Sequence, residues 1–145
     1  MANIMEVAKY ILHKQGEMST MKLEKLCYYC QAWHLVWEEV PLFEEDFQAW
    51  ANGPVCPQLF YLHKNIFKIN ENILSQFSID SLKDNEKESI DIVIKEYGEK
   101  EGYWLSELIH KERPWKETRN GIPKGERCSR VISKNLIQEY YSGLQ

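Results

Sequence analysis

One stretch, from Met21 to Leu62, constrains the fold more than any other part of the chain. It begins with apolar residues at steps of three and four, a spacing that places them on one side of an α-helix. These residues are Leu23, Leu26, Cys27, Cys30, Trp33, His34 and Trp37. The polar residues fall mostly on the opposite side, and they are Lys22, Glu24, Lys25, Gln31 and Glu38. The pattern predicts a long amphipathic helix with one buried face.

The second half of this stretch predicts two turns, with a short extended segment between them, followed by a new helix. Pro41 turns the chain because proline fixes φ and has no N–H to donate. A short extended segment, Phe47–Trp50, follows, and Asn52-Gly53-Pro54 has the composition of a turn. Pro57 suits the first position of a new helix, which we expect to end near Lys64 or Phe67.

The flanking segments predict further helices. Asn3 can cap a first helix that Gly16 ends, and Ser19 or Thr20 can start the long helix, so the two are expected to form an antiparallel hairpin. Later helices are expected behind a capping box at 85–88, between Tyr103 and Pro114, over one turn at 115–119, and after Ser133. Residues 65–83 have no sustained period, and we interpret them as a connection pinned to the body by its scattered apolar side chains.

Together these segments predict a mostly α (α+β) fold. We expect one compact helical domain over residues 1–145, with about six or seven helices and a small two- to three-stranded accessory sheet. Arg130-Val131-Ile132 is plausible as an extended segment that pairs with Phe47–Trp50. The apolar runs are shorter than the roughly 18–20 residues that span a bilayer, and the N-terminus has no signal-peptide pattern. Four cysteines without such a signal indicate a reducing, cytoplasmic setting.

Charge is distributed unevenly along the chain. Residues 1–110 hold 10 Lys and Arg against 18 Asp and Glu, whereas residues 111–134 hold 8 basic residues against 3 acids. Such a basic segment indicates either a solvated face, a contact with the acidic part of the same chain, or a nucleic-acid contact. The nucleic-acid alternative, a regulator of a phage or mobile-element operon, would use Lys116, Arg119, Lys124, Arg127 and Arg130 on phosphates.

Cysteines and histidines raise the alternatives of metal, redox or acid–base chemistry. Cys27 and Cys30 form a C-x-x-C, but they lie within an apolar helical pattern, where cysteine behaves as a core residue. Cys56 and Cys128 do not form a second close pair, as a zinc site of this kind usually requires. His34, His63 and His110 lack a recognisable nucleophile or metal-site motif around them; we expect His34 to be a core residue bonded to backbone. The sequence therefore predicts no enzyme, no catalytic residue, no metal site and no cofactor; a metal-assisted enzyme is the weakest alternative.

Aromatic residues suggest a binding surface instead. Trp33 and Trp104 are expected to fill the core, whereas Trp50 precedes a turn that should lie near the surface. Trp and Tyr dominate the energetic centres of protein interfaces, although packing demands the same residue types. The candidate partner-binding residues are Trp50, Asn52, Gly53, Pro54, Tyr61, Pro114 and Trp115.

Several segments also resemble the Panacea domain family, described as GepA-like phage-associated proteins and SocA-like antitoxins. The matching segments are 22–26, 28–34, 47–50, 53–57, 105–110, 114–116 and Arg119. The resemblance implies an antitoxin that neutralises a cognate protein toxin encoded nearby, with SocA-like members also delivering the toxin to a protease. On this hypothesis the candidate residues frame the toxin-binding surface, and the acidic loop of Glu38, Glu39, Glu44, Glu45 and Asp46 steers a basic toxin.

Overall fold

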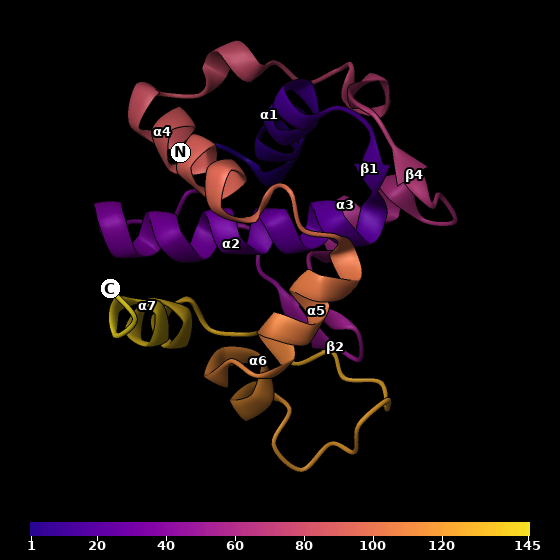
Figure 1. The fold of residues 1–145 in the computed structure, drawn as a ribbon, viewed down its shortest axis with the longest axis vertical. Coiled ribbons are helices and arrows are strands. Elements are labelled where there is room, and N and C mark those ends of the chain that lie inside the picture. The colour runs from indigo at the N-terminus through magenta and orange to yellow at the C-terminus, as the bar shows by residue number, and fades with distance from the viewer.

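A computed structural model describes residues 1–145, and the predicted long helix forms its centre (Figure 1). This helix is α2 (Thr20–Glu38). Figure 1 shows α1 (Ile4–Gln15) and α4 (Asp84–Tyr97) on one side of it. On the other side lie α5 (Gly102–His110), α6 (Arg113–Thr118) and α7 (Lys134–Ser142). The short α3 (Pro57–His63) packs against the N-terminal half of α2.

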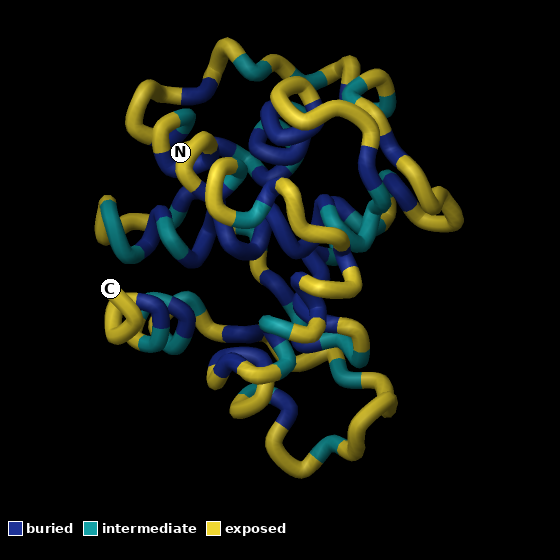
Figure 2. The backbone as a smooth tube through the Cα atoms, in the orientation of Figure 1, coloured by how far each residue is buried: buried dark blue, intermediate teal, exposed yellow.

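The central helix is buried on all sides over much of its length (Figure 2). Every residue from Leu23 to Ala32 is buried. The hydrophobic residues of this range belong to a core of 33 buried hydrophobic side chains. The prediction that Glu24, Lys25 and Gln31 lie on a solvent-facing side was wrong. Helices pack on two sides of α2 and a strand packs on a third, so no side of its middle remains for water.

The buried polar side chains of α2 are satisfied by segments distant in sequence. Gln31 accepts a hydrogen bond from the Leu42 N–H and donates one to the Phe43 carbonyl, both at 2.7 Å. It therefore fixes the loop that follows α2. Buried amides and charges need such partners, because an unpaired polar group in the interior costs about 1–3 kcal/mol.

Four short strands form two antiparallel pairs. β1 (Met18–Ser19) pairs with β4 (Lys68–Ile69), and β2 (Gln48–Trp50) pairs with β3 (Gly53–Val55). The predicted extended segment at 130–132 does lie beside β2: the Ala49 N–H donates to the Arg130 carbonyl, and the Ile132 N–H donates to the Phe47 carbonyl, both at 2.9 Å. The mostly helical fold with a small sheet is thus confirmed, with seven α-helices and the strands divided between two sheets.

Helix starts follow the predicted caps at three of four positions. The side chains of Asn3, Ser19 and Ser133 each accept a backbone hydrogen bond at the start of α1, α2 and α7. The fourth lies two residues earlier than predicted, because Glu86 reaches back to the Lys83 N–H at 2.8 Å and α4 begins at Asp84. In Figure 1 the axis of α1 is steeply inclined to that of α2, so the two do not form the predicted antiparallel hairpin.

Residues 65–83 form the expected connection, which contains β4 and two 3₁₀ turns (Glu71–Leu74 and Ile79–Ser81) packed on α1. Leu74 and Leu82 are buried and pin it as predicted. Ile66 and Phe67 are exposed, so their predicted anchoring role was wrong. The prediction that Trp104 is a core residue was also wrong. Its side chain on α5 is 44% exposed, and the Lys100 ammonium lies above its ring.

None of the helices combines the length and apolar character needed to cross a bilayer.

Candidate partner-binding surface

Aromatic and apolar side chains that are exposed or half-buried lie on β2, on α3 and on the turn between α3 and β4. Tyr61 and Phe67 are 72% and 76% exposed, the two highest values among the large hydrophobic residues. Trp50 and Phe60 are half-buried and meet edge to face, with ring centres 4.9 Å apart. We call Trp50, Phe60, Tyr61, Ile66 and Phe67 the aromatic surface. Large exposed aromatic groups of this kind are typical of protein-binding sites.

A buried carboxylate on α2 holds both ends of α3 beneath this surface. One oxygen of Glu24 accepts the Cys56 N–H at 2.9 Å, and the other lies 2.7 Å from Nε2 of His63. Cys56 precedes the first residue of α3, and His63 is its last. Both side chains of the Glu24–His63 pair are at most 5% exposed. The helix that carries Tyr61 is therefore clamped to the centre of the fold at both ends.

A buried lysine holds the corner between β2 and α3. Lys25 is 2% exposed, and its Nζ donates to the Pro54 carbonyl at 3.3 Å. Burial lowers the pKa of Lys25 to about 8, because an ammonium loses its hydration in the interior; the neighbouring Glu24 partly opposes this shift. Gly53 has φ +122°, and a Cβ at this position would lie 2.7 Å from Cε of Lys25. Only glycine fits here without strain.

The turn between α3 and β4 has a fixed backbone although its side chains are exposed. The Thr20 N–H and hydroxyl donate to the carbonyls of Phe67 and Ile66 at 2.9 and 3.0 Å. The Ile66 N–H donates to the His63 carbonyl at 2.9 Å, and Asn65 between them takes a left-handed conformation with φ 67°. The first turn of α2 therefore fixes the backbone of Ile66 and Phe67.

The predicted partner-binding residues are brought close together but differ in exposure. Asn52 and Tyr61 are exposed and Trp50 is half-buried. Gly53, Pro54, Pro114 and Trp115 are buried. Nε1 of Trp115 donates to the Trp50 carbonyl at 2.8 Å, and the Trp115 ring stacks on His110 with centres 4.1 Å apart. Of the buried members, Gly53 and Pro54 belong to β3, which pairs with β2, and Trp115 bonds to β2.

The basic residues of the nucleic-acid alternative likewise differ in their exposure and in their contacts within the chain. Arg119 is buried, and its guanidinium donates to the carbonyls of Ala49, Pro123 and Glu126. Arg130 donates to the carbonyls of Thr118 and Asn120. These two guanidinium groups hold the 119–130 segment against the sheet, whereas Lys116, Lys124 and Arg127 are exposed.

Three of the four cysteines and two of the four histidines are buried. Cys27, Cys30 and Cys56 are buried free thiols, and burial raises the pKa of each, so they remain protonated. No three His, Cys, Asp or Glu side chains in the structure lie close enough to hold a metal ion. His34 is buried but bonds to the Ser89 hydroxyl at 2.8 Å, not to backbone as predicted. Burial lowers the pKa of His110, whose Nε2 is buried without a partner.

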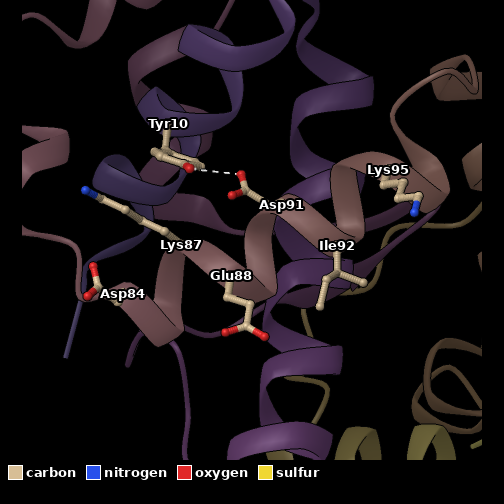
Figure 3. Close-up of a pocket in the computed structure, with 7 residues that line it drawn as sticks. All are labelled: Tyr10, Asp84, Lys87, Glu88, Asp91, Ile92 and Lys95. Carbon is tan, nitrogen blue, oxygen red and sulfur yellow. Dashed lines mark hydrogen bonds between the residues drawn. The ribbon is translucent and has the colours of Figure 1, made fainter.

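A shallow hollow of about 410 Å³ lies elsewhere, between α1 and the outer side of α4 (Figure 3). Figure 3 shows Lys87 and Lys95 interspersed with carboxylates along α4, and the Tyr10 hydroxyl donating to Asp91 at 2.9 Å. Burial, with the bond to Asp91, raises the pKa of Tyr10 to about 12, so the phenol is a donor and not a base. The residues that line the hollow include no nucleophile paired with a base, and their charges are mixed.

The sequence reasoning missed Phe60, Ile66 and Phe67. A signal for the last two was present: they lie between two lysines, Lys64 and Lys68, in a segment rich in amides and devoid of acids. An apolar pair in such a polar context indicates an exposed turn.

A comparison with models of protein families found a match. The family model described as antitoxin SocA-like, Panacea domain, matches residues 23–116. The chain belongs to this family. The match begins in α2 and ends in α6, so it contains the corner, the Glu24 and Lys25 contacts and the whole aromatic surface of this Panacea domain.

Membership supports an antitoxin-like role in general terms, and with it a protein partner. The comparison with curated proteins and the comparison with solved structures each gave no match. Segments 22–26 and 53–57, which resemble the Panacea family, contact each other in the fold: Glu24 and Lys25 from the first segment bond to Cys56 and Pro54 from the second.

Proposed function

We propose that this Panacea domain is a cytoplasmic antitoxin that neutralises a protein toxin encoded nearby by binding it directly through the aromatic surface. The observation that supports the proposal is the combination of exposed Tyr61 and Phe67 side chains with a backbone held by Glu24, Lys25 and Thr20. A surface that is already ordered loses little conformational entropy on binding, so more of its contact energy becomes affinity.

Neutralisation by this route needs no catalytic group on the antitoxin. The toxin is occupied as long as the complex persists, and for a surface of this type affinity is set mostly by how slowly the complex dissociates. Delivery of the bound toxin to a protease is an additional step that the same complex would permit. The test below separates binding from delivery, because purified components contain no protease.

The experiment uses the product of the adjacent gene, co-expressed and purified with this protein. Tyr61→Ala with Phe67→Ala is the informative double variant, because both side chains are exposed and neither contributes to the core. Trp50 is left intact, because its half-buried ring packs on Phe60 and its Nε1 donates to Gln48, so alanine there would also remove contacts within the fold.

We expect the double variant to lose toxin rescue in cells and to bind at least about 30-fold more weakly, since interface hot spots each contribute about 2 kcal/mol or more. The matched control is Val40→Ala, which removes an exposed apolar side chain just after α2 ends and should retain full rescue. A folded double variant that binds and rescues as well as the wild type would refute the proposed surface.

A further inference from the structure

The aromatic surface has an unusual charge environment for this chain. The protein has 22 Asp and Glu and a net charge of −4, yet no acid occurs from Phe47 to Asn70. The lysines in that segment are Lys64 and Lys68, which stand on either side of Ile66 and Phe67. His63, the remaining titratable base there, is buried against Glu24. The segment next to Phe67 therefore carries two lysines and no acid, although the protein as a whole is acidic.

Both lysines are exposed and unpaired. Lys64 follows the last residue of α3, and Lys68 stands in β4 opposite Ser19. Neither takes part in any ion pair of the structure, whereas Lys134 and Arg113 pair with Asp46 and Glu117. Glu71, the first carboxylate after this segment, lies 3.2 Å from His13. The charges beside Phe67 thus remain available to another molecule.

Part of the acidic loop that was expected to steer a basic toxin is engaged within the chain, and part lies at the far end of α2 from Phe67. Asp46 pairs with Lys134, and Glu45 accepts the Ile4 N–H. Glu38 and Glu39 stand at the C-terminal end of α2, whereas Thr20 at its N-terminal end holds Phe67. A helix of 19 residues is about 28 Å long, several times the roughly 8 Å screening length at physiological salt.

We propose that the aromatic surface binds a protein segment whose apolar side chains are flanked by Asp or Glu. This inference rests on the proposed function and adds the chemistry of the partner. Tyr61, Ile66 and Phe67 supply the apolar centre, and Lys64 and Lys68 supply the polar rim. Interfaces are commonly built in this way, and complementary rim charges set association rate and partner choice more than affinity.

An anionic membrane shares the same charge but fits the surface less well. Two lysines near a lipid surface contribute about 1 kcal/mol each, and the net charge of −4 opposes the approach of the rest of the protein. Stable attachment to a bilayer generally needs a larger apolar or basic element than one turn. A protein partner with a local acidic rim needs no such element.

The experiment measures binding of the adjacent gene product to the full-length protein at about 50, 150 and 500 mM NaCl, a range over which the electrostatic screening length changes severalfold. The test variant is Lys64→Glu with Lys68→Glu. The matched control is Lys83→Glu with Lys95→Glu, which reverses two exposed lysines beside and on α4 without touching the aromatic surface.

We expect salt to weaken binding by the wild type and by the control. The Lys64/Lys68 variant should bind about 10-fold more weakly at the lowest salt, mainly through slower association, and added salt should no longer weaken its binding, because salt now screens a repulsion. Equal or tighter binding by this variant, with an unchanged response to salt, would overturn the inference.

The outcomes separate the inference from the proposed function. If Tyr61→Ala with Phe67→Ala abolishes binding but the lysine reversal has no effect, the proposed function stands and the acidic partner is refuted. If the wild type does not bind the gene product, both are refuted. Binding to phosphatidylserine vesicles that the lysine reversal abolishes, without any effect on toxin binding, would also refute a protein partner for these two charges.

Discussion

Replacing the buried Lys25 by methionine should change how the stability of this protein depends on pH. Lys25 is fully enclosed, and burial lowers its pKa from 10.5 to about 8. One pKa unit corresponds to 1.36 kcal/mol, so keeping this ammonium charged in the folded state costs about 3 kcal/mol. Methionine has a similar length and no charge, so Lys25→Met removes that cost while it gives up the 3.3 Å hydrogen bond to Pro54.

The sign follows from proton binding. Below pH 8 the lysine is protonated in both states, and its burial cost is fully present. Between pH 8 and 10.5 the folded protein releases the proton while the unfolded chain retains it, so the wild type gains stability relative to the variant as pH rises. We expect the free energy of unfolding of the wild type minus that of Lys25→Met to rise by about 2–3 kcal/mol between pH 7 and pH 10.

Urea denaturation followed by tryptophan fluorescence at each pH measures this difference. The buried thiols of Cys27, Cys30 and Cys56, whose pKa values are raised, also change stability at alkaline pH, but they are common to both proteins and cancel. Leu26→Met is the control, because Leu26 is buried in the same helix and has no titratable group. A difference that stays constant with pH for Lys25→Met would refute the argument that a charged lysine is buried at this corner.

Three further predictions concern the contacts around α2. Gly53→Ala should destabilise the protein by roughly 1–3 kcal/mol in the same urea assay, because its φ is +122° and the new methyl group would meet the immobile Lys25 side chain. Tyr141→Phe should lower the free energy of unfolding by about 1–3 kcal/mol, because the Tyr141 hydroxyl donates to the buried Glu112 carboxylate at 2.7 Å and connects α7 to the core. A decrease below about 0.5 kcal/mol, which is close to measurement error, would contradict this. Arg119→Ala should speed trypsin cleavage in the 120–130 loop severalfold, whereas Lys116→Ala, which removes an exposed side chain, should not.

The sequence predicted the elements of this fold well because local chemistry governs them. Asn3, Ser19 and Ser133 start helices with their own side chains, and these three caps require no information from elsewhere in the chain. The pairing of residues 130–132 with β2 was also predicted, from the extended character of both segments.

Exposure was harder to predict than secondary structure. An apolar pattern with a period of 3.6 residues shows that a helix has a buried side, but it does not show whether the other side meets water. Phe67 illustrates the converse error: an apolar residue in an irregular segment was expected to anchor that segment, and the Thr20 hydrogen bonds hold its backbone so that the ring stays outside.

The sequence by itself determined a mostly helical chain organised on one long central helix, because helix caps, proline and apolar spacing act within a few residues. Only the tertiary structure decided that Glu24 and Lys25 turn inward to hold the corner and α3, and that Tyr61 and Phe67 remain outside. The physical reason is that a charged group can be buried only where distant segments supply its partners, and those partners, Cys56, His63 and Pro54, come together only in the folded protein.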